Sequence, residues 1–376
     1  MKVTGIIAEC NPLHEGHEYL IREAKARTQA DYVIAAMSGD YVQRGAPSIL
    51  SREERAAALL SKGVDLVVEL PLYVSCSGAD YFARGAVALL DSLGVVTDLV
   101  FGSESGDLEA LRAAAEKLGE EDESYRASLR EGLRNGLSFP QARAAAAGEA
   151  VPVSPNDLLG TEYLRALNAS GSEIRPHAVL RTKSRSASEI RAQMLENRED
   201  SDPFLCRDDF SDLLLHALCG AESAEHLCRY LDVSEGLAGR ILRELPSYST
   251  FSGFCEAVKS RNYTYTRISR AMLHILLGMT SHTMERFDRS CGLCGWIRPI
   301  GFQRSAAPLL TAIASDCSVP FLDKLSRAEQ LLPGELYAIL EEEVRAEFLY
   351  DLMAARRSKN AGSHAVTAFR KPLIIA

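Results

Sequence analysis

The chain has 376 residues, of which 47% are hydrophobic and 25% charged, and its formal net charge is −9. This composition is typical of a soluble globular protein of about two domains and excludes a disordered or fibrous chain. The sequence holds no apolar run of about 18 residues, so we expect no membrane span. We also expect no secretory signal, because the first residues enter a strand-like segment directly. The negative charge argues against indiscriminate nucleic-acid binding but leaves room for a local basic face.

Nine cysteines are scattered through the chain, and only Cys291 and Cys294 form a C-x-x-C pair. A structural zinc site would need a second pair at suitable spacing, which the sequence lacks. We therefore expect reduced thiols, mostly in the core, in a cytoplasmic protein without a metal site. Redox or metal chemistry at this pair is an open alternative.

The first expected strand, Val3–Ala8, is followed by the most informative segment, Glu9-Cys-Asn-Pro-Leu-His-Glu-Gly-His17. Helical spacing begins directly after it. A strand that ends in His-x-Gly-His at a helix start is typical of a phosphate site, because Gly16 permits close approach and the helix start offers free N–H groups. His14 and His17 could then donate hydrogen bonds to phosphoryl oxygens. From this segment alone, the alternatives are a surface turn with incidental histidines or a pair of metal ligands.

Up to about residue 195, short segments rich in Val, Ile and Leu alternate with helical stretches. The expected strands are Val3–Ala8, Tyr32–Met37, Leu66–Leu70, Leu99–Gly102 and Ile174–Leu180. Repeated strand–helix units with nearly continuous apolar strands predict a Rossmann-like α/β domain, whose parallel sheet is covered by helices on both faces. Ligands bind such sheets at the carboxyl ends of the strands.

Helix starts and a domain boundary can also be read from the sequence. Ser51 and Ser186 begin capping boxes, and Ser154 precedes a proline at a first helical position. The alanine-rich stretch Asp107–Ala147 predicts helices between the fourth and fifth strands, with a solvated acidic turn at Glu120–Glu123. The polar patch before Pro203 predicts two domains, residues 1–198 and a mainly α-helical 203–376. The expected helical segments of the second domain are Leu213–Leu218, Gly236–Leu245, Ser269–Leu277 and Glu335–Met353.

Four further motifs follow strands or open helices. The loop Ser38–Gly45 follows the second strand, and Phe101–Glu104 ends the fourth, where Gly102 would let a base or ribose lie against the backbone. Ser154–Gly160 opens a helix, and Ser186–Arg191 brings two hydroxyls and an arginine to another helix start. Alone, the Ser38–Gly45 segment is equally consistent with an ordinary polar loop, and the two helix starts are consistent with ordinary helix caps. In a sequence that also contains a His-x-Gly-His turn, the Ser186–Arg191 motif predicts a second anion site opposite that turn.

Together these motifs resemble the nucleotidylyltransferase superfamily, and most closely its branch of tRNA(Met) cytidine acetate ligases. The typical family motifs are E-Y-N-P-F-H-N-G-H, S-G-N-F-V-Q-R-G, E-L-P, F-G-S-E, S-P-N-x-x-L-G and S-A-T-x-I-R, and this chain has a counterpart of each in the same order. The resemblance covers the N-terminal half and continues at Lys259–Arg270. Cys10 and Leu13 replace a tyrosine and a phenylalanine, which leaves the acetate pocket unassigned. Asp40 replaces an asparagine and adds a charge.

The resemblance implies an ATP-dependent ligase that makes acetyl-adenylate and pyrophosphate from ATP and acetate, and then acetylates N4 of the wobble cytidine in elongator tRNA(Met). It implies that His14 and His17 contact the phosphates, and that Ser186, Ser188 and Arg191 hold the leaving pyrophosphate. Mg²⁺ on the phosphates is expected from ATP chemistry, with no carboxylate singled out as its ligand. The implied ATP site comprises Ile7, Ala8, Glu9, Cys10, Asn11, Pro12, Leu13, His14, Glu15, Gly16, His17, Glu18, Tyr19, Leu20, Gly102, Asn156 and Arg181.

The expected tRNA-binding cluster lies in the second half of the chain. Its basic residues are interleaved with Tyr263 and Tyr265, so that cations can contact phosphates and aromatic rings can stack on bases. The alternative is a solvated helix face balanced by nearby acids such as Glu341–Glu343. The cluster comprises Lys259, Arg261, Arg267 and Arg270, and a second basic group comprises Arg356, Arg357, Lys359, Arg370 and Lys371.

Two rival functions remain at this point. The first is a small-molecule adenylyltransferase of the same superfamily in coenzyme biosynthesis, against which the long basic second half counts. The second is a module that binds ATP or tRNA without chemistry, although pure binding would require only one of the two anion sites. The sequence makes no prediction about oligomeric state.

Overall fold

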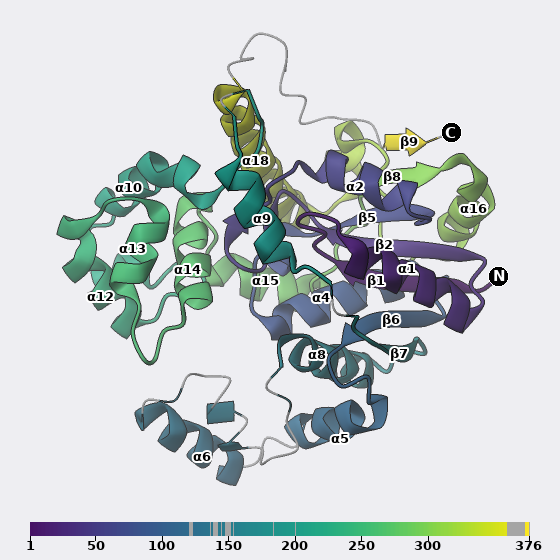
Figure 1. The fold of residues 1–376 in the computed structure, drawn as a ribbon, viewed down its shortest axis with the longest axis horizontal. Helices are drawn as coiled ribbons and strands as arrows, with labels where there is room; N and C mark the ends of the chain where they lie inside the picture. Colours follow the sequence, from purple (N-terminus) through teal and green to yellow (C-terminus); the bar gives the residue numbers. More distant parts are fainter. Residues whose placement is uncertain are drawn as a thin grey trace.

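The main sheet contains seven strands among the residues that the structure describes, in the order β7-β6-β1-β2-β5-β8-β9 (Figure 1). The structure is a computed structural model and describes residues 1–119, 123–135, 137, 142–143, 145–146, 152, 154–182, 184–199, 201–358 and 373–375. The strands of the sheet are β1 (Val3–Ala8), β2 (Tyr32–Ser38), β5 (Leu66–Leu70), β6 (Asp98–Ser103), β7 (Arg175–Leu180), β8 (Pro299–Gln303) and β9 (Leu373–Ile375).

The first five strands of the sheet are parallel, which confirms the predicted Rossmann-like fold and all five expected strands. From β1 the chain adds β2 and β5 on one side, and it then crosses back to add β6 and β7 on the other. The strand order therefore reverses between β1 and β6. In open α/β sheets this reversal leaves a crevice at the carboxyl ends of the strands, and ligands bind there.

Helices cover both faces of the sheet because successive strand residues point to opposite sides. These helices are α1 (Glu15–Thr28), α2 (Arg52–Ser61), α4 (Ala79–Ser92) and α8 (Pro155–Ser170). On β2, Val33, Ala35 and Met37 pack in the core that α1 and α2 complete. Ile34 and Ala36 point the other way, into the core that α4 and α8 complete. The near-continuous apolar strands thus reflect burial on both faces.

The predicted helix starts are confirmed. Ser51 and Ser186 each form a capping box, and Ser186 opens α9 (Ala187–Glu196). Ser154 is the N-cap residue of α8 with Pro155 in the first turn, although its hydroxyl donates to the Asp157 carboxylate instead of capping a backbone group. The inserted helices are α5 (Leu108–Gly119) and α6 (Glu123–Arg134), while residues 120–122 of the expected acidic turn lie outside the described residues.

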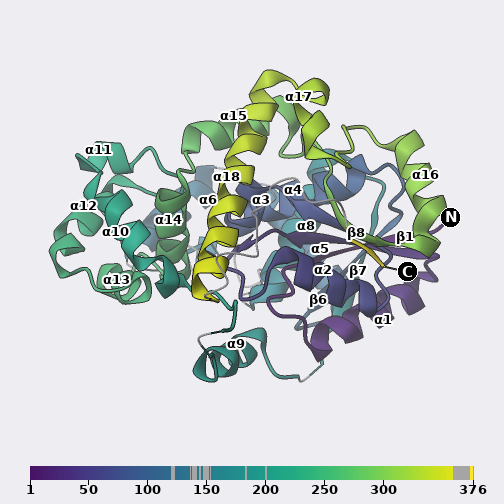
Figure 2. The same ribbon diagram turned by 90° about the horizontal axis from the view of Figure 1, so that it is seen from above.

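A lobe of short helices follows and stands beside the sheet, with α10 and α12–α14 on the left in Figure 1. Viewed from above, the lobe and α9 flank the same end of the long helix α18 (Figure 2). All four helical segments expected after residue 203 are confirmed. None of the helices in the described part of the chain is long and apolar enough to cross a bilayer. The helices of this half are α10 (Ser211–Cys219), α11 (Ala224–Leu227), α12 (Glu235–Glu244), α13 (Phe251–Val258), α14 (Tyr265–Leu277), α15 (Ser281–Cys291), α16 (Ala307–Asp316), α17 (Ala328–Leu331) and α18 (Gly334–Arg357), with 3₁₀ turns at Arg207–Phe210, Leu245–Ser247, Arg304–Ala306 and Leu325–Arg327.

The second half is not helical throughout, because β8 pairs antiparallel with β5 and β9 pairs parallel with β8. Neither strand was predicted from the sequence. Pro299 and Gly301 interrupt the five residues of β8, and Pro299 is tolerated because it is the first residue of the strand, before the pairing with β9 begins at Gly301. The division into domains 1–198 and 203–376 stays a proposal, since the chain returns to the first sheet after the helical lobe.

A buried ion-pair network fastens α18 to the sheet. Arg52 of α2 and Arg298, next to β8, both pair with Glu69 of β5 and with Glu347 of α18. All four side chains are less than 10% exposed. Asp40 accepts the backbone N–H of Arg52 in the same region, and burial raises the pKa of its carboxyl group to about 8. The carboxyl group at position 40 therefore lies beneath α2, away from the crevice, and is mostly protonated near neutral pH, so it adds little charge.

The loop between β3 (Tyr41–Val42) and β4 (Ala46–Pro47) connects the sheet to the helical lobe. The Gly45 carbonyl accepts hydrogen bonds from Arg207 Nε at 3.1 Å and from the Ser269 hydroxyl at 2.6 Å. Gly45 has φ +68°, and a Cβ atom there would lie 2.3 Å from the backbone nitrogen of Arg270. Only glycine permits this close approach of the loop to α14.

We expect Gly45→Ala to lower the free energy of unfolding by about 3 kcal/mol, from left-handed strain and the clash with α14. Gly63→Ala is the matched control, because Gly63 has φ +95° but no atom within 4 Å of the added Cβ. The control should lose only the strain, about 1 kcal/mol. Urea denaturation of both variants measures the difference, and equal losses would contradict the steric argument.

Candidate active site

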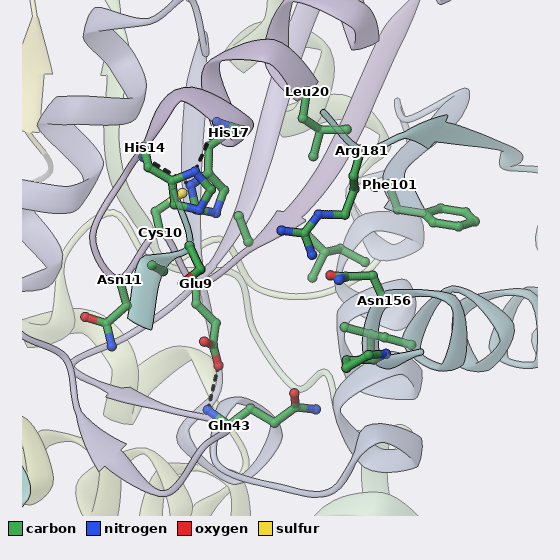
Figure 3. A pocket seen from close by; sticks show the side chains of 18 of the residues that line it. Glu9, Cys10, Asn11, His14, His17, Leu20, Gln43, Phe101, Asn156 and Arg181 are labelled. Carbon is green, nitrogen blue, oxygen red and sulfur yellow. Dashed lines mark hydrogen bonds between the residues drawn. The ribbon is translucent and has the colours of Figure 1, made fainter. Parts of the chain in front are cut away.

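A cavity of about 370 Å³ lies at the carboxyl ends of β1 and β6, at the point where the strand order reverses (Figure 3). It collects residues from the predicted motifs of the N-terminal half except the E-L-P motif, Glu69–Pro71. Of the predicted site residues, Ile7, Ala8, Glu9, Cys10, Asn11, His14, Gly16, His17, Tyr19, Leu20, Gly102, Asn156, Arg181, Ser186, Ser188 and Arg191 line it. Pro12, Leu13, Glu15 and Glu18 are not on its wall. The wall also contains Gln43, Arg44, Phe82, Phe101, Glu104, Pro155, Leu159, Tyr163, Val179, Thr182 and Ala187.

The His-x-Gly-His segment forms the start of α1, and its two imidazoles face the cavity. His14 is the N-cap residue, and its Nδ1 accepts the Gly16 N–H at 3.0 Å. His17 Nδ1 accepts the His14 N–H at 3.3 Å. The ring centroids lie 4.0 Å apart. A Cβ atom on Gly16 would lie 2.8 Å from the His14 ring, so glycine is required between the histidines.

These hydrogen bonds determine where the imidazole protons lie. Because each Nδ1 accepts a backbone N–H, the proton of each neutral ring is on Nε2, which remains available to donate. Burial and the charges of His14 and Arg181 lower the pKa of His17 to about 3. Burial, with Arg181 as the next cause, also lowers the pKa of His14. Both rings are therefore neutral hydrogen-bond donors near neutral pH.

The start of α9 faces the same cavity from the opposite side. Arg191 donates to the Asn11 carbonyl and to the Ser188 hydroxyl, the latter at 3.0 Å. Ser186 exchanges hydrogen bonds with Glu189 in the capping box. Burial lowers the pKa of the Arg191 guanidinium, with Arg44 as the next cause. The two predicted anion sites therefore lie at one cavity and are joined through Arg191.

The motifs Phe101–Glu104 and Ser154–Gly160 contact each other beside Gly102. Glu104 accepts the backbone N–H groups of Asn156 and Asp157 at 3.1 and 2.9 Å, and it pairs with Arg181 at 3.5 Å. In return, Asp157 accepts the Glu104 N–H at 2.9 Å and the Ser103 hydroxyl. Both acidic residues lie within motifs recognised in the sequence, but neither had a predicted role. The sequence signal that could have indicated their contact is one acidic residue at the end of a strand, Glu104, and another in the first turn of a helix, Asp157.

Comparison with known proteins identifies the family. A model of the HIGH nucleotidyl transferase family matches residues 1–194 and 184–364. The tRNA(Met) cytidine acetate ligase of Acetivibrio thermocellus is 34% identical, with 93% of this chain and 94% of that protein covered. The protein of the same name from Thermoanaerobacter sp. is also 34% identical, with coverages of 96% and 98%. The chain belongs to the tRNA(Met) cytidine acetate ligase family.

Solved structures agree with this assignment. Thermotoga maritima TmcAL bound with alpha-thio ATP matches over 100% of both chains, with a TM-score of 0.89 and 29% identity. Its apo form matches with the same TM-score. The resemblance inferred from ordered motifs is thus confirmed over the full length. The match includes the helical lobe.

Among tRNA(Met) cytidine acetate ligases, this chain departs from the motif at Cys10 and Leu13. Cys10 lines the cavity, and burial raises the pKa of its thiol to about 12, so it is a thiol and not a nucleophilic thiolate. Leu13 packs against the core behind α1. The C-x-x-C pair lies elsewhere, and both Cys291 and Cys294 are free thiols.

The predicted tRNA-binding cluster of this chain lies at and just before the start of α14. Arg261 is exposed, and Lys259 pairs with Glu256 at 3.2 Å on the surface. Arg267 lies over the Tyr263 ring at 5.2 Å. Arg270 instead forms an ion pair with Asp232 at 2.9 Å and is only 15% exposed. The structure thus leaves the first three available to a partner, whereas Arg270 holds the lobe together.

The second basic group is only partly described. Arg356 and Arg357 form the last turn of α18, and Arg357 donates to the Glu199 carbonyl at 3.4 Å. Lys359, Arg370 and Lys371 lie outside the described residues.

Proposed function

We propose that this chain activates acetate with ATP and transfers the acetyl group to N4 of the wobble cytidine of elongator tRNA(Met). The observation that carries the proposal is the pair of helix starts, α1 and α9, that face one cavity with His14, His17 and Arg191 on its wall. Family membership and the names of the relatives support it. Cytoplasmic location remains a prediction.

The first step requires no protein nucleophile. An acetate oxygen attacks the α-phosphorus of ATP, a new O–P bond forms, and the bond to pyrophosphate breaks. Negative charge grows on the phosphoryl oxygens, where neutral Nε2–H groups of His14 and His17 can donate without being deprotonated. Arg191 and Ser188 would hold the departing pyrophosphate at the start of α9. The protein thus supplies position and charge stabilisation.

Mg²⁺ is expected to arrive with ATP. Among the residues that the structure describes, no three His, Cys, Asp or Glu side chains gather into a metal site. Mg²⁺ usually retains water ligands and binds through substrate phosphates, with few protein ligands. The site therefore fits an ion held mainly by the nucleotide, which would neutralise phosphate charge.

ATP–pyrophosphate exchange tests the first half of the proposal. Exchange that depends on acetate, with and without elongator tRNA(Met), is the expected result. No acetate-dependent exchange would rule out the ligase activity. Exchange that requires another acid or a phosphate acceptor would favour a small-molecule adenylyltransferase instead.

Arginines at the start of α14 test the tRNA half. We expect the double variant Arg261→Ala, Arg267→Ala to retain normal ATP–pyrophosphate exchange in the absence of tRNA. Its KM for tRNA should rise, because each lost phosphate contact weakens binding. The slope of log affinity against log salt should fall by about 1 for each contact. Arg270→Ala is not suitable here, since it would leave Asp232 without its partner. Arg327→Ala, on the far 3₁₀ turn, is the control, and an equal change in the control would contradict the assignment.

A further inference from the structure

Glu9 lies in the segment that the resemblance assigns to the ATP site, but its carboxyl group is apart from the groups that face the phosphates in the proposed function. It follows β1 directly, and its Oε1 accepts the Gln43 backbone N–H at 2.8 Å. Its second carboxyl oxygen accepts no hydrogen bond from any residue in the described part of the chain. The side chain lines the cavity. Glu9 therefore offers one carboxylate oxygen to a ligand within the site.

The ligand of this oxygen must be a hydrogen-bond donor and not a phosphate. A phosphate beside a carboxylate in a desolvated site would be repelled, and the donors for phosphates lie on the other walls. Figure 3 shows the Glu9 carboxyl group pointing away from His14 and His17, toward Gln43. Burial raises the pKa of Glu9, and the Gln43 N–H and Arg44 oppose this shift. The carboxylate is consequently a stronger proton acceptor than an exposed one.

The position of Glu9 also relates it to the tRNA side of the molecule. Gln43, which holds its carboxylate, belongs to the loop whose Gly45 carbonyl is bound by Arg207 and by Ser269 of α14. The helix that begins with the expected tRNA-binding cluster thus packs directly on the loop beside Glu9. A nucleotide that leaves a tRNA bound at α14 would enter the cavity past Gln43 and Arg44.

We propose that Glu9 accepts a hydrogen bond from the N4 amino group of the cytidine and takes its proton during acetyl transfer. The inference rests on the proposed function. N4 attacks the acetyl carbonyl carbon of acetyl-adenylate, the N4–C bond forms, and the C–O bond to the phosphate breaks. AMP leaves with that electron pair, and the proton of N4 passes to Glu9. No further reactant is required.

The same contact would distinguish bases. A carboxylate is a suitable acceptor for the exocyclic amine of cytosine. Uracil presents a carbonyl oxygen at this position, and two acceptors facing each other leave both unsatisfied in a buried site. Glu9 would therefore select cytidine as well as promote its reaction.

Glu9→Gln is the decisive variant, because glutamine retains an acceptor oxygen for the Gln43 N–H but is no base. Acetyl-adenylate formation is measured by trapping with hydroxylamine. Hydroxylamine is a nucleophile that attacks the activated acetyl group without help from the protein. Acetyl transfer to elongator tRNA(Met) is followed in parallel in single turnovers. We expect transfer to fall 10²- to 10⁴-fold, the range for loss of a general base, with a far smaller change in hydroxamate formation and in the KM for tRNA.

Glu104→Gln provides the matched control. It also removes a carboxylate from the cavity wall, but one already occupied by Asn156, Asp157 and Arg181, so both half-reactions should change alike. The inference fails if Glu9→Gln lowers transfer and trapping in parallel, or if it lowers neither. A wild-type protein that forms no hydroxamate from acetate and ATP would instead overturn the proposed function itself.

Discussion

Replacing His17 by alanine is expected to lower acetate-dependent ATP–pyrophosphate exchange by about 10²- to 10³-fold, the range for loss of one donor to a developing oxyanion. The His17 ring is held by the His14 N–H on Nδ1, so its Nε2–H has a fixed direction into the cavity. Such a donor stabilises the charge of the transition state without any reorganisation during the reaction. The loss should appear mainly in kcat, since the other phosphate contacts remain.

The pH profile of exchange gives an independent check on His17. Because its pKa is lowered to about 3, the ring stays neutral throughout the working range. Wild-type exchange should therefore show no limb from His17 between about pH 5 and pH 8, where an ordinary histidine titrates. His226→Ala is the control, because His226 stacks on Tyr230 in the helical lobe and is not on the cavity wall. A His17 variant as active as this control would remove the imidazole from the mechanism.

Replacing Glu347 by alanine is expected to lower the free energy of unfolding by about 3–5 kcal/mol, the usual cost of removing one partner from a buried ion pair. Glu347 pairs with Arg298 and, at 2.5 Å, with Arg52. Without it, the two buried guanidinium groups would share Glu69, and the remaining partners, Glu53 and Asp40, pair with Arg52 and not with Arg298. The network joins α18 to α2 and to the sheet edge, so the helix should loosen where it crosses them. Urea denaturation of the variant measures the loss.

Glu335→Ala on the same helix is the matched control. Glu335 also pairs with an arginine, Arg286, at 2.6 Å, but both side chains are at least 40% exposed. Such surface pairs contribute about 0–1 kcal/mol. If both variants lose the same amount, burial does not determine the strength of the Glu347 pairs.

Acid should remove the contribution of Glu347 selectively. Burial opposes ionisation of Glu347, but Arg298 and Arg52 outweigh it and lower its pKa from 4.5 to about 2. A carboxylate with a depressed folded-state pKa stabilises the fold above its unfolded pKa, and this stabilisation is lost as the pH falls through the folded value. The difference between wild type and Glu347→Ala should therefore shrink between about pH 5 and pH 2. A constant difference would contradict the ion-pair explanation.

Much of the parallel sheet could be predicted because its information is local. The apolar runs at Val3–Ala8 and Leu66–Leu70 coincide with β1 and β5, since a strand buried on both faces requires apolar residues throughout. Helix caps are local as well, and the boxes at Ser51 and Ser186 form as expected. By contrast, β8 depends on pairing with β5, more than 200 residues earlier in the chain, which periodicity does not reveal.

The sequence by itself determined the family, and it predicted the starts of α1 and α9 and the two histidines as a phosphate site, because these depend on motifs a few residues long. Only the tertiary structure decided how single charged side chains are used. Arg270 forms an ion pair with Asp232, whereas Glu9 has one carboxylate oxygen that remains available to a ligand in the cavity. Both are charged residues within recognised motifs, and spacing alone does not tell them apart. Their roles depend on partners from distant segments, since burial and pairing are set by the packing of the whole chain.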